Sequence, residues 1–198
     1  MENAILKVSE IRECERFTMQ KQGISSLQLM EQAGAACAET LYYNVLLYDV
    51  QDVYFYVGTG NNGGDGVVMA IRLLEEHHLV NQVHLVICAP ENARYSSEME
   101  YQLQRWQKVS EQYENAHTIH YTADNQPEEK EDDIIVDALF GIGLNKPITG
   151  FFAEVIQHIN ESLAYVVSVD IPSGLFADQH TPDHSAAVIA DKVLSIQF

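Results

Sequence analysis

The glycine-rich stretch at residues 57–66, VGTGNNGGDG, constrains the fold of this chain more than any other feature. Before it, residues 52–57 are rich in β-branched and aromatic side chains, as in a buried strand. After it, apolar residues recur at helical spacing up to residue 77. The pattern predicts a strand, a glycine turn with close backbone approach and positive φ, and then a helix. Free backbone N–H groups and the positive end of the helix dipole would meet at that turn, which suits a phosphate oxygen.

The glycine spacing at residues 58–63 also matches the dinucleotide-binding pattern G-x-G-x-x-G. The ordinary form of that pattern needs an acidic residue at the end of the second strand to hold a ribose. The second strand is predicted at residues 83–88, and Glu91 comes only after Ala89 and Pro90. This argues against an ordinary NAD dehydrogenase. The turn also carries amide and carboxylate groups beyond what a tight turn requires, those of Asn61, Asn62 and Asp65.

Composition indicates a single globular domain, since 46% of the 198 residues are hydrophobic. We expect a helical arm at residues 1–48 packed on an α/β core at residues 49–198. The net charge of −18, from 29 acidic and 11 basic residues, argues against a nucleic-acid or anionic-membrane partner. Cys14, Cys37 and Cys88 are widely spaced, which argues against a disulfide framework or a zinc site and fits a cytoplasmic protein. The sequence shows neither a signal-peptide pattern nor an apolar run long enough to span a bilayer.

Two helices are predicted before the glycine stretch. The first has Ser9 as its N-cap and ends at Gly23, and the second begins at Ser25 or Ser26. Small side chains at residues 33–36 of the second helix would let another backbone approach closely. That backbone could belong to the glycine turn or to a second subunit.

Helices and strands alternate after the glycine stretch. A helix is predicted at residues 96–114, with Trp106 as a core anchor, followed by an acidic loop at 123–133. The remaining elements are a strand at 134–140, a helix at 151–161, and strands at 165–170 and 192–197. Such alternation implies right-handed βαβ units. We therefore predict an α/β fold, Rossmann-like and doubly wound, with a mainly parallel sheet, helices on both faces and an N-terminal helical pair.

Polar residues cluster where the predicted strands end. Asp137 lies within an apolar strand, and Asp170 closes the next one. Turns follow both strands, at residues 141–147 and 171–175. Because the carboxyl ends of parallel strands share one edge, where ligands bind, a site is expected there. A buried carboxylate such as that of Asp137 has to be paired, hydrogen-bonded or bound to a cation, which favours a functional role.

Other reactive patterns are weaker. His180 and His184 flank Pro182, and no H-E-x-x-H occurs, which argues against zinc. Ser173 lies in Pro-Ser-Gly without a G-x-S-x-G elbow or a paired histidine, which argues against a serine nucleophile.

Four motifs stand out together: LMEQAG at residues 29–34, VGTGNNGGDG at 57–66, VDALFGIGL at 136–144 and VDIPSGL at 169–175. In this order they resemble the NAD(P)H-hydrate epimerase family, also known as the YjeF N-terminal domain, over nearly the whole chain. The resemblance implies epimerisation of the R and S forms of hydrated NADH and NADPH (NADHX and NADPHX), which repairs damaged nicotinamide cofactor. It also implies a cytoplasmic homodimer and, in bifunctional relatives, a fused C-terminal dehydratase domain. Family members usually continue past the last strand, so a shortened C-terminal end is expected.

The same resemblance implies the residues of the site. The hydrate would be bound by Asn61, Asn62, Gly63, Gly64, Asp65, Gly141, Ile142, Gly143, Leu144, Asn145, Lys146, Pro147 and Asp170. One potassium ion per subunit would be held by Asn62, Asp137 and Ser173. Amide, carboxylate and hydroxyl oxygens are hard ligands that suit such a cation, which would also offset the burial of Asp137.

The reaction itself sets further requirements. The hydrated nicotinamide carries a hydroxyl on the carbon next to the ring nitrogen, so inversion breaks and remakes a bond there without net electron transfer. A general acid must assist the departing oxygen, and a carboxylate can stabilise the cationic ring. Asp137 is the first catalytic candidate and Asp170 the second, with Asp170 as the acid if a cation fully engages Asp137. Lys146 is a candidate for holding a phosphate or orienting a water.

Two other functions are compatible with the sequence. The same fold serves as a non-catalytic binding and dimerisation module in mRNA-decapping scaffold proteins, and the fold alone would also permit a nucleotide-binding regulatory domain. The charge of −18 and the intact Asn-Asn-Gly-Gly-Asp and Asp137 favour the enzyme.

Overall fold

A parallel sheet of six strands, in the order β3-β2-β1-β4-β5-β6, organises the described part of the chain, residues 6–45, 52–76 and 80–196 of a computed structural model. The strands are β1 (Asp52–Val57), β2 (Gln82–Ile87), β3 (Ala116–His120), β4 (Ile134–Ala138), β5 (Tyr165–Val169) and β6 (Lys192–Leu194). Every neighbouring pair is parallel. The chain builds outward from β1 to β3 and then returns to place β4 beside β1. The direction of winding therefore changes between β1 and β4, which is where open sheets of this kind bind ligands.

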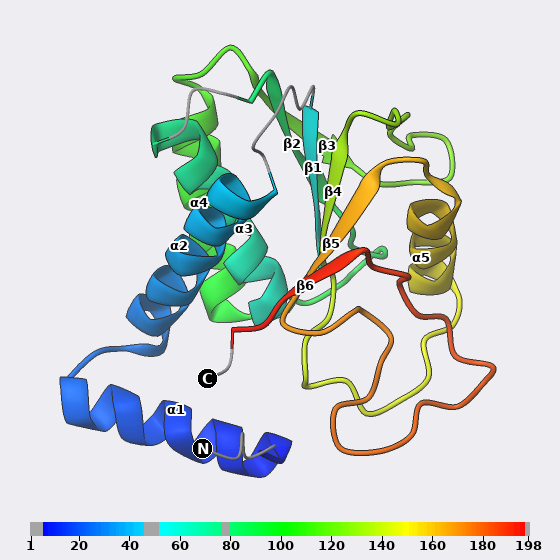
Figure 1. The fold of residues 1–198 in the computed structure, drawn as a ribbon. Helices are drawn as coiled ribbons and strands as arrows, with labels where there is room; N and C mark the ends of the chain where they lie inside the picture. Colours follow the sequence, from blue (N-terminus) through cyan, green and yellow to red (C-terminus); the bar gives the residue numbers. More distant parts are fainter. Residues whose placement is uncertain (1–5, 46–51, 77–79, 197–198) are drawn as a thin grey trace.

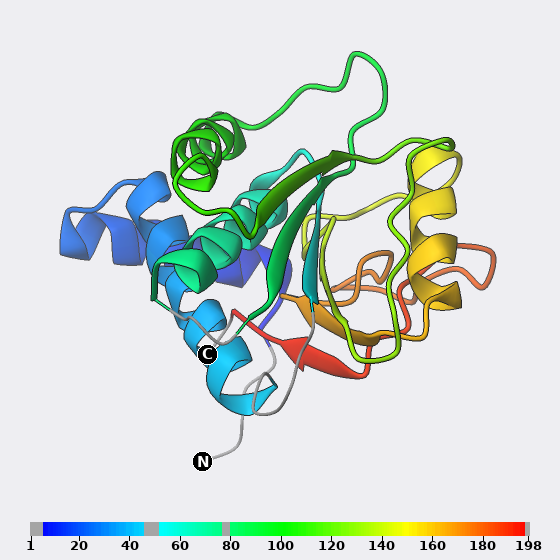
Figure 2. The same cartoon turned by 90° about the horizontal axis from the view of Figure 1, so that it is seen from above.

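Helices cover both faces of the sheet, as predicted. They are α1 (Val8–Gln22), α2 (Ser26–Asn44), α3 (Asn61–Glu76), α4 (Ser97–Ser110) and α5 (Phe151–Glu161). Figures 1 and 2 show α2, α3 and α4 on one side of the sheet and α5 on the other. Each side has its own buried apolar cluster, one around Phe55 and Met69 and the other around Tyr56 and Ile156. No helix in the described ranges is long and apolar enough to cross a membrane.

Helix ends follow local capping chemistry. Ser25 caps α2 by accepting the N–H of Gln28 at 3.2 Å, and Gly23 ends α1 in the left-handed conformation at φ 65°. The prediction of Ser9 as the cap of α1 is wrong, because the helix begins earlier and Lys7 is the N-cap residue. The Glu10 carboxylate accepts the N–H of Lys7 at 2.8 Å, which stabilises this earlier start.

Strand β3 was not predicted. Helix α4 ends at Ser110, four residues before the predicted end, and the chain then forms an edge strand in which no residue is fully buried. Such a strand has little apolar content to reveal it in the sequence. Trp106 is a core residue as predicted, and its Nε1 donates to Thr118 Oγ1 at 2.7 Å, which fastens α4 to β3. The strands predicted to reach residues 140 and 170 end at Ala138 and Val169; the last strand ends at Leu194, and residues 77 and 197 lie outside the described residues.

The glycine stretch differs from its prediction in one respect. Helix α3 begins at Asn61, so residues 61–66 are its first turns, and the described glycines with positive φ lie elsewhere in the chain. The close approach was predicted correctly. A Cβ on Gly58 would lie 2.1 Å from the Leu139 carbonyl oxygen, and one on Gly63 would lie 2.1 Å from that of Gly58. These glycines let α3 pack directly against the ends of β1 and β4.

The small residues of α2 serve the same purpose within the chain. A Cβ on Gly34 would lie 2.6 Å from Cβ of Val68 and 3.0 Å from the main-chain oxygen of Asp65. The first predicted neighbour is therefore confirmed, since the glycine stretch and the helix that it begins approach α2; the second subunit remains a prediction.

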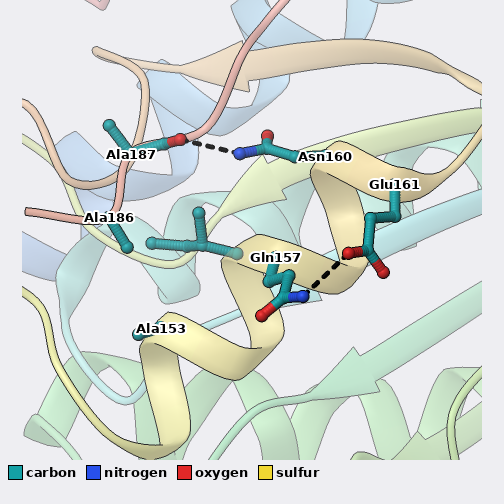
Figure 3. A pocket seen from close by; sticks show the side chains of 7 residues that line it. Ala153, Gln157, Asn160, Glu161, Ala186 and Ala187 are labelled. Carbon is teal, nitrogen blue, oxygen red and sulfur yellow. Dashed lines mark hydrogen bonds between the residues drawn. The ribbon is translucent and has the colours of Figure 1, made fainter.

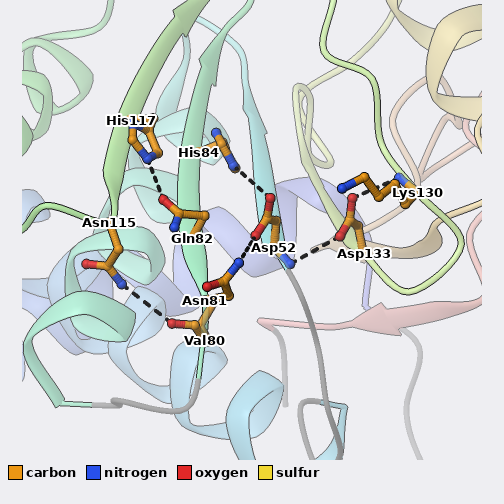
Figure 4. A network of polar contacts seen from close by, with 9 residues as sticks. All are labelled: Asp52, Val80, Asn81, Gln82, His84, Asn115, His117, Lys130 and Asp133. Carbon is orange, nitrogen blue, oxygen red and sulfur yellow. Dashed lines mark hydrogen bonds and ion pairs between the residues drawn. The ribbon is translucent and has the colours of Figure 1, made fainter.

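The opposite edge of the sheet, where β1 and β2 begin, is closed by a polar network (Figure 4). Asp133 accepts the N–H of Lys130 at 2.8 Å and that of Asp52 at 3.1 Å. The Asp52 carboxylate in turn accepts from Asn81 at 3.0 Å and lies 3.4 Å from His84 Nε2. These contacts attach the acidic loop to the start of the sheet, so the network is structural and remote from the carboxyl edge.

Candidate functional site

Three segments meet at the carboxyl edge of the sheet: the start of α3, the loop after β4 and the loop after β5. The N–H of Gly58 donates to the Ala138 carbonyl oxygen at 3.1 Å, which ties the end of β1 to the end of β4. Nδ2 of Asn62 donates to the Val169 carbonyl oxygen at 3.4 Å, which brings α3 to the end of β5. The structure therefore brings together the polar residues that the sequence places on separate strands.

Asp137 is fully buried and hydrogen-bonded on both carboxylate oxygens. Ser173 donates its hydroxyl to Oδ1 at 2.5 Å and its N–H to Oδ2 at 2.9 Å. Ser168 donates its hydroxyl to Oδ2 at 2.7 Å, and the N–H of Leu139 reaches Oδ1 at 3.2 Å. A carboxylate has about four acceptor positions, so all of them are used.

This arrangement changes what the sequence argument expected of Asp137. Burial raises the pKa of the carboxyl, and the bonds from Ser173, Ser168 and Leu139 act in the opposite direction. Four donors directed at the two oxygens favour the ionised form and leave no position for its own proton. These hydrogen bonds therefore offset part of the cost of burying the Asp137 carboxylate.

Asp170 is placed differently. It sits just past β5 with φ 71°, an uncommon conformation for a residue other than glycine, and its Oδ2 accepts the N–H of Ile142 at 2.8 Å. A Cβ on Gly141 would lie 2.4 Å from that oxygen and 3.4 Å from Cγ of Asn62. Only a glycine at position 141 therefore fits between Asp170 and Asn62. Burial raises the pKa of Asp170, and the bond from Ile142 partly opposes this.

Two further carboxyl groups lie near Asp170. Asp65, in α3, has its pKa raised well above the usual range by burial and then by the charges of Asp170 and Glu15. The pKa of Glu15, in α1, is raised by partial burial and by Asp170, and lowered by Arg12. The edge thus carries several like charges in an environment that disfavours charge, an arrangement common at functional sites.

Helix α1 is the contribution that the sequence analysis missed. It brings Glu15 near Asp170, and it places Arg12 Nη2 where a Cβ on Gly143 would be 3.6 Å away. Glu15 comes four residues after the buried Ile11 and three after Arg12, so it lies next to both on the helix surface. That spacing is present in the sequence. A short helix with one buried side chain, however, does not indicate which part of the protein it packs against.

The remaining predicted binding residues fall into two groups. Gly64 faces α2, because a Cβ there would lie 2.6 Å from Sδ and Cε of Met30. The stretch from Gly141 to Pro147 forms a loop with a turn, in which the N–H of Leu144 donates to the Gly141 carbonyl oxygen at 3.3 Å. Most of that loop is exposed, namely Gly143, Asn145, Lys146 and Pro147.

The start of α3 can bind an anion. The first i→i−4 bond of the helix runs from the N–H of Gly64 to the Gly60 carbonyl oxygen at 3.2 Å. The N–H groups of the three residues before Gly64 therefore have no intrahelical acceptor, and the helix dipole adds partial positive charge there. A phosphate at this position would satisfy both.

The oxygen atoms around Asn62 and Ser173 fit a hard cation. The Ser173 hydroxyl accepts the N–H of Phe140 at 2.9 Å and lies 3.1 Å from the Phe140 carbonyl oxygen. The Val169 carbonyl oxygen lies by the Asn62 amide. Within the described ranges, no group of three His, Cys, Asp or Glu side chains could hold a metal ion, so the available ligands are neutral oxygens beside one carboxylate. That set suits a large monovalent ion better than zinc.

A separate recess lies between α5 and the segment before β6 (Figure 3). Its polar side chains already have partners. Asn160 donates to the Ala187 carbonyl oxygen at 2.9 Å and accepts the N–H of Ile189 at 2.8 Å, and Gln157 donates to Glu161 at 2.7 Å. The recess therefore offers no reactive group and lies apart from the carboxyl edge.

Comparison with known proteins gives a consistent result. A family model described as "YjeF-related protein N-terminus" matches residues 26–198. An NAD(P)H-hydrate epimerase of Limosilactobacillus reuteri is 35% identical over 178 residues, which cover 90% of this chain and 77% of that protein. The epimerase of Lentilactobacillus buchneri is 36% identical over 173 residues, covering 87% and 74%.

Two further similarities are to a longer, bifunctional protein and to a solved structure. A bifunctional NAD(P)H-hydrate repair enzyme, Nnr, of Thermofilum pendens is 33% identical over 183 residues, which are 88% of this chain but 32% of that protein. The crystal structure of the yeast protein YNL200c superposes with a TM-score of 0.76 at 21% identity, covering 98% of this chain and 80% of that one. This second similarity supports the fold.

Proposed function

The chain belongs to the family of YjeF-related protein N-termini, as do the NAD(P)H-hydrate epimerases, and we propose that it interconverts the R and S forms of NADHX and NADPHX at the carboxyl edge of its sheet. Its relatives are enzymes, which favours catalysis over the non-catalytic module that the fold would also permit. The structural observation that carries the proposal is the position of Asp170. Its carboxyl stands between the start of α3 and the loop after β4, within reach of a ligand bound to either.

Asp170 is the general acid of this proposal. Protonated Asp170 gives its proton to the hydroxyl on the carbon next to the ring nitrogen, and the carbon–oxygen bond breaks to release water. The lone pair of the ring nitrogen compensates for the broken bond, so the ring becomes cationic. The Asp170 carboxylate then stabilises this positive charge. Water adds to the opposite face and releases its extra proton to solvent, and Asp170 takes up a proton from solvent, so atoms balance and no electrons are gained or lost overall. Burial shifts the pKa of Asp170 upward, which is the direction that favours a proton donor.

Asp137 has a positioning role in this scheme. Its bonds to Ser173 and Leu139 fix the loops after β5 and β4 relative to each other. This reverses the order of preference expected from the sequence, in which Asp137 was the first candidate for the acid. A group with every acceptor position occupied is a poor proton donor.

The substrate is held from two sides. The anion-binding end of α3 receives a phosphate, with Asn61 and Asn62 in the first turn beside it. The loop from Gly141 to Pro147 lies on the other side, and Lys146 is its exposed cation.

Potassium is part of the proposal. Asn62 and Ser173 would hold one ion per subunit, together with neighbouring main-chain oxygens, and Asp137 would complete the site by contributing its negative charge through its bonds to Ser173. The ion would supply positive charge at an edge that otherwise carries several carboxylates.

We also propose that the protein is a cytoplasmic homodimer and that it acts together with a dehydratase. The bifunctional repair enzyme of Thermofilum pendens gives that partnership a precedent in a relative.

A coupled reaction tests the proposal. A dehydratase that accepts one epimer consumes only that part of an NADHX mixture. Adding this protein should let the other epimer be consumed too, while the protein alone neither consumes nor produces NADH. Persistence of the second epimer at its uncatalysed rate would contradict the proposal, and Asp170→Asn is the matched inactive control.

A further inference from the structure

One face of α1 is turned toward the candidate site. The N–H of Val8 donates to Oδ1 of Asp178 in the loop after β5, at 2.9 Å. Ile11 is the buried side chain of the helix. Arg12 lies against Gly143 in the loop after β4, and Glu15 lies near Asp170. Figure 1 shows α1 as an arm at the end of the molecule where these loops gather.

Arg12 differs from most of the other arginines in the described residues. Arg16 pairs with Glu13, Arg72 with Glu76 and Arg105 with Glu31. No ion pair or hydrogen bond to the Arg12 guanidinium occurs within the part of the chain that the structure describes. Arg12 is exposed and its charge acts on Glu15, one turn along the same helix, so its guanidinium remains accessible to a ligand at the loop after β4.

The charge of the site calls for such a cation. The ionised Asp137 carboxylate gives the edge a negative charge, and the proposed substrate carries a negatively charged diphosphate, so the two repel each other. The partial positive charge at the start of α3 is only about half a unit. A guanidinium offers paired N–H donors that match two phosphate oxygens.

We propose that Arg12 binds the diphosphate of the hydrated dinucleotide, so that α1 makes the site selective for dinucleotides over smaller hydrated nicotinamides. This inference rests on the proposed function. It gives α1 a role in substrate recognition. Packing against the rest of the protein would explain only the buried Ile11 of this helix.

Steady-state kinetics on two substrates test the inference. The variants are Arg12→Ala and Arg16→Ala, one turn further along the same helix, where the arginine pairs with Glu13 at 3.6 Å and 73% of its side chain is exposed. The substrates are NADHX and hydrated dihydronicotinamide riboside, which has no phosphate. With Arg12→Ala, KM for NADHX should rise about tenfold or more while kcat changes little, because a charge-assisted contact to substrate is lost. KM for the riboside should stay the same, and Arg16→Ala should match wild type on both substrates.

Other outcomes separate the possible failures. Equal losses on both substrates, or an unchanged KM for NADHX, would overturn the role of Arg12 and leave it as a structural partner of Glu15 on the helix. Absence of epimerisation by the wild type would count against the proposed function. Calorimetric titration with inorganic pyrophosphate still decides the anion site in that case. Weaker binding in Arg12→Ala than in wild type and Arg16→Ala supports the inference, and affinity that is unchanged in Arg12→Ala, or no binding to wild type, contradicts it.

Discussion

Ser173 binds Asp137 twice, donating its hydroxyl to one carboxylate oxygen at 2.5 Å and its N–H to the other at 2.9 Å. Both side chains are buried; Asp137 lies near the end of β4, and Ser173 lies in the loop after the neighbouring strand β5. The pair therefore fixes the relative position of the two loops that border the candidate site. It also occupies acceptor positions of the Asp137 carboxylate, which is why we propose Asp170 as the general acid.

Replacing Ser173 should destabilise the fold. Ser173→Ala removes the hydroxyl donor and leaves one acceptor position of a buried carboxylate unfilled, which should cost about 1–3 kcal/mol of unfolding free energy. Urea denaturation measures it. Ser9→Ala, on the exposed surface of α1, is the control and should change the same quantity by no more than about 0.5 kcal/mol. Equal stabilities of the two variants would show that the Ser173 hydroxyl does not hold Asp137.

Asp65 should make stability depend on pH. Because the folded state raises its pKa, proton binding to Asp65 favours folding. This contribution is complete below the unfolded pKa of about 3.9 and is lost as the pH rises through the folded-state pKa. Asp65→Asn should therefore stabilise the protein at pH 8, by about 1 kcal/mol, and lose this advantage in acid.

Denaturation of both proteins at pH 8 and at pH 4.5 measures the difference. Asp124→Asn, in an exposed loop, is the matched control for removing one negative charge. A gain from Asp65→Asn that is equal at both pH values would contradict the account.

Two glycines of the same stretch should respond differently to alanine. Gly58→Ala puts a Cβ 2.1 Å from a main-chain oxygen, and the backbone there cannot move without separating β1 from β4, so a loss of about 3 kcal/mol is expected. Gly60→Ala meets no atom within 4 Å and should leave stability within about 0.5 kcal/mol of wild type. Thermal or urea denaturation compares them. A reversed order would mean that the packing at the end of β1 is described incorrectly.

Potassium should stabilise the folded protein if its site is formed as proposed. A ligand that binds only the native state raises the melting temperature by mass action. Melting should be higher in potassium chloride than in a bulky organic cation at equal ionic strength, and Asn62→Ala should abolish the difference. Comparing the two salts within each variant removes any direct effect of the substitution. A potassium effect of the same size in Asn62→Ala would place the ion elsewhere.

The layers of the fold could be predicted because each carries its own pattern. The apolar runs of β1 and β4 are buried, and α5 carries an apolar stripe on one side. Each element therefore has a pattern of apolar residues that can be recognised in the sequence. Strand β3 carries no such signal, because it lies at the sheet edge with His117 and His120 exposed. The extent of α3 was missed for a related reason, since glycines and asparagines that look like a turn also form its first turns.

The site could be predicted only in part. Asp137 and Asp170 were identified as polar residues at strand ends, and parallel pairing brings such ends to one edge. Whether Asp137 or Asp170 is turned toward a ligand depends on hydrogen-bond donors such as Ser168 and Ser173. The positions of these donors are set by the fold and cannot be read from the sequence. The approach of Arg12 to Gly143 joins residues 131 positions apart, and no local pattern predicts a contact of that range.

The most direct test of the account is the time course of the two NADHX epimers, separated by chromatography, starting from one pure epimer. Wild-type protein should bring the epimers to equilibrium far faster than buffer alone. Asp170→Asn, which keeps the side-chain shape and tolerates the left-handed backbone, should be slower by about a hundredfold or more. In the wild type the rate should fall as the pH rises through the raised pKa of Asp170, because the acid loses its proton. Equilibration by wild type no faster than in buffer, or by Asp170→Asn as fast as by wild type, would contradict the account.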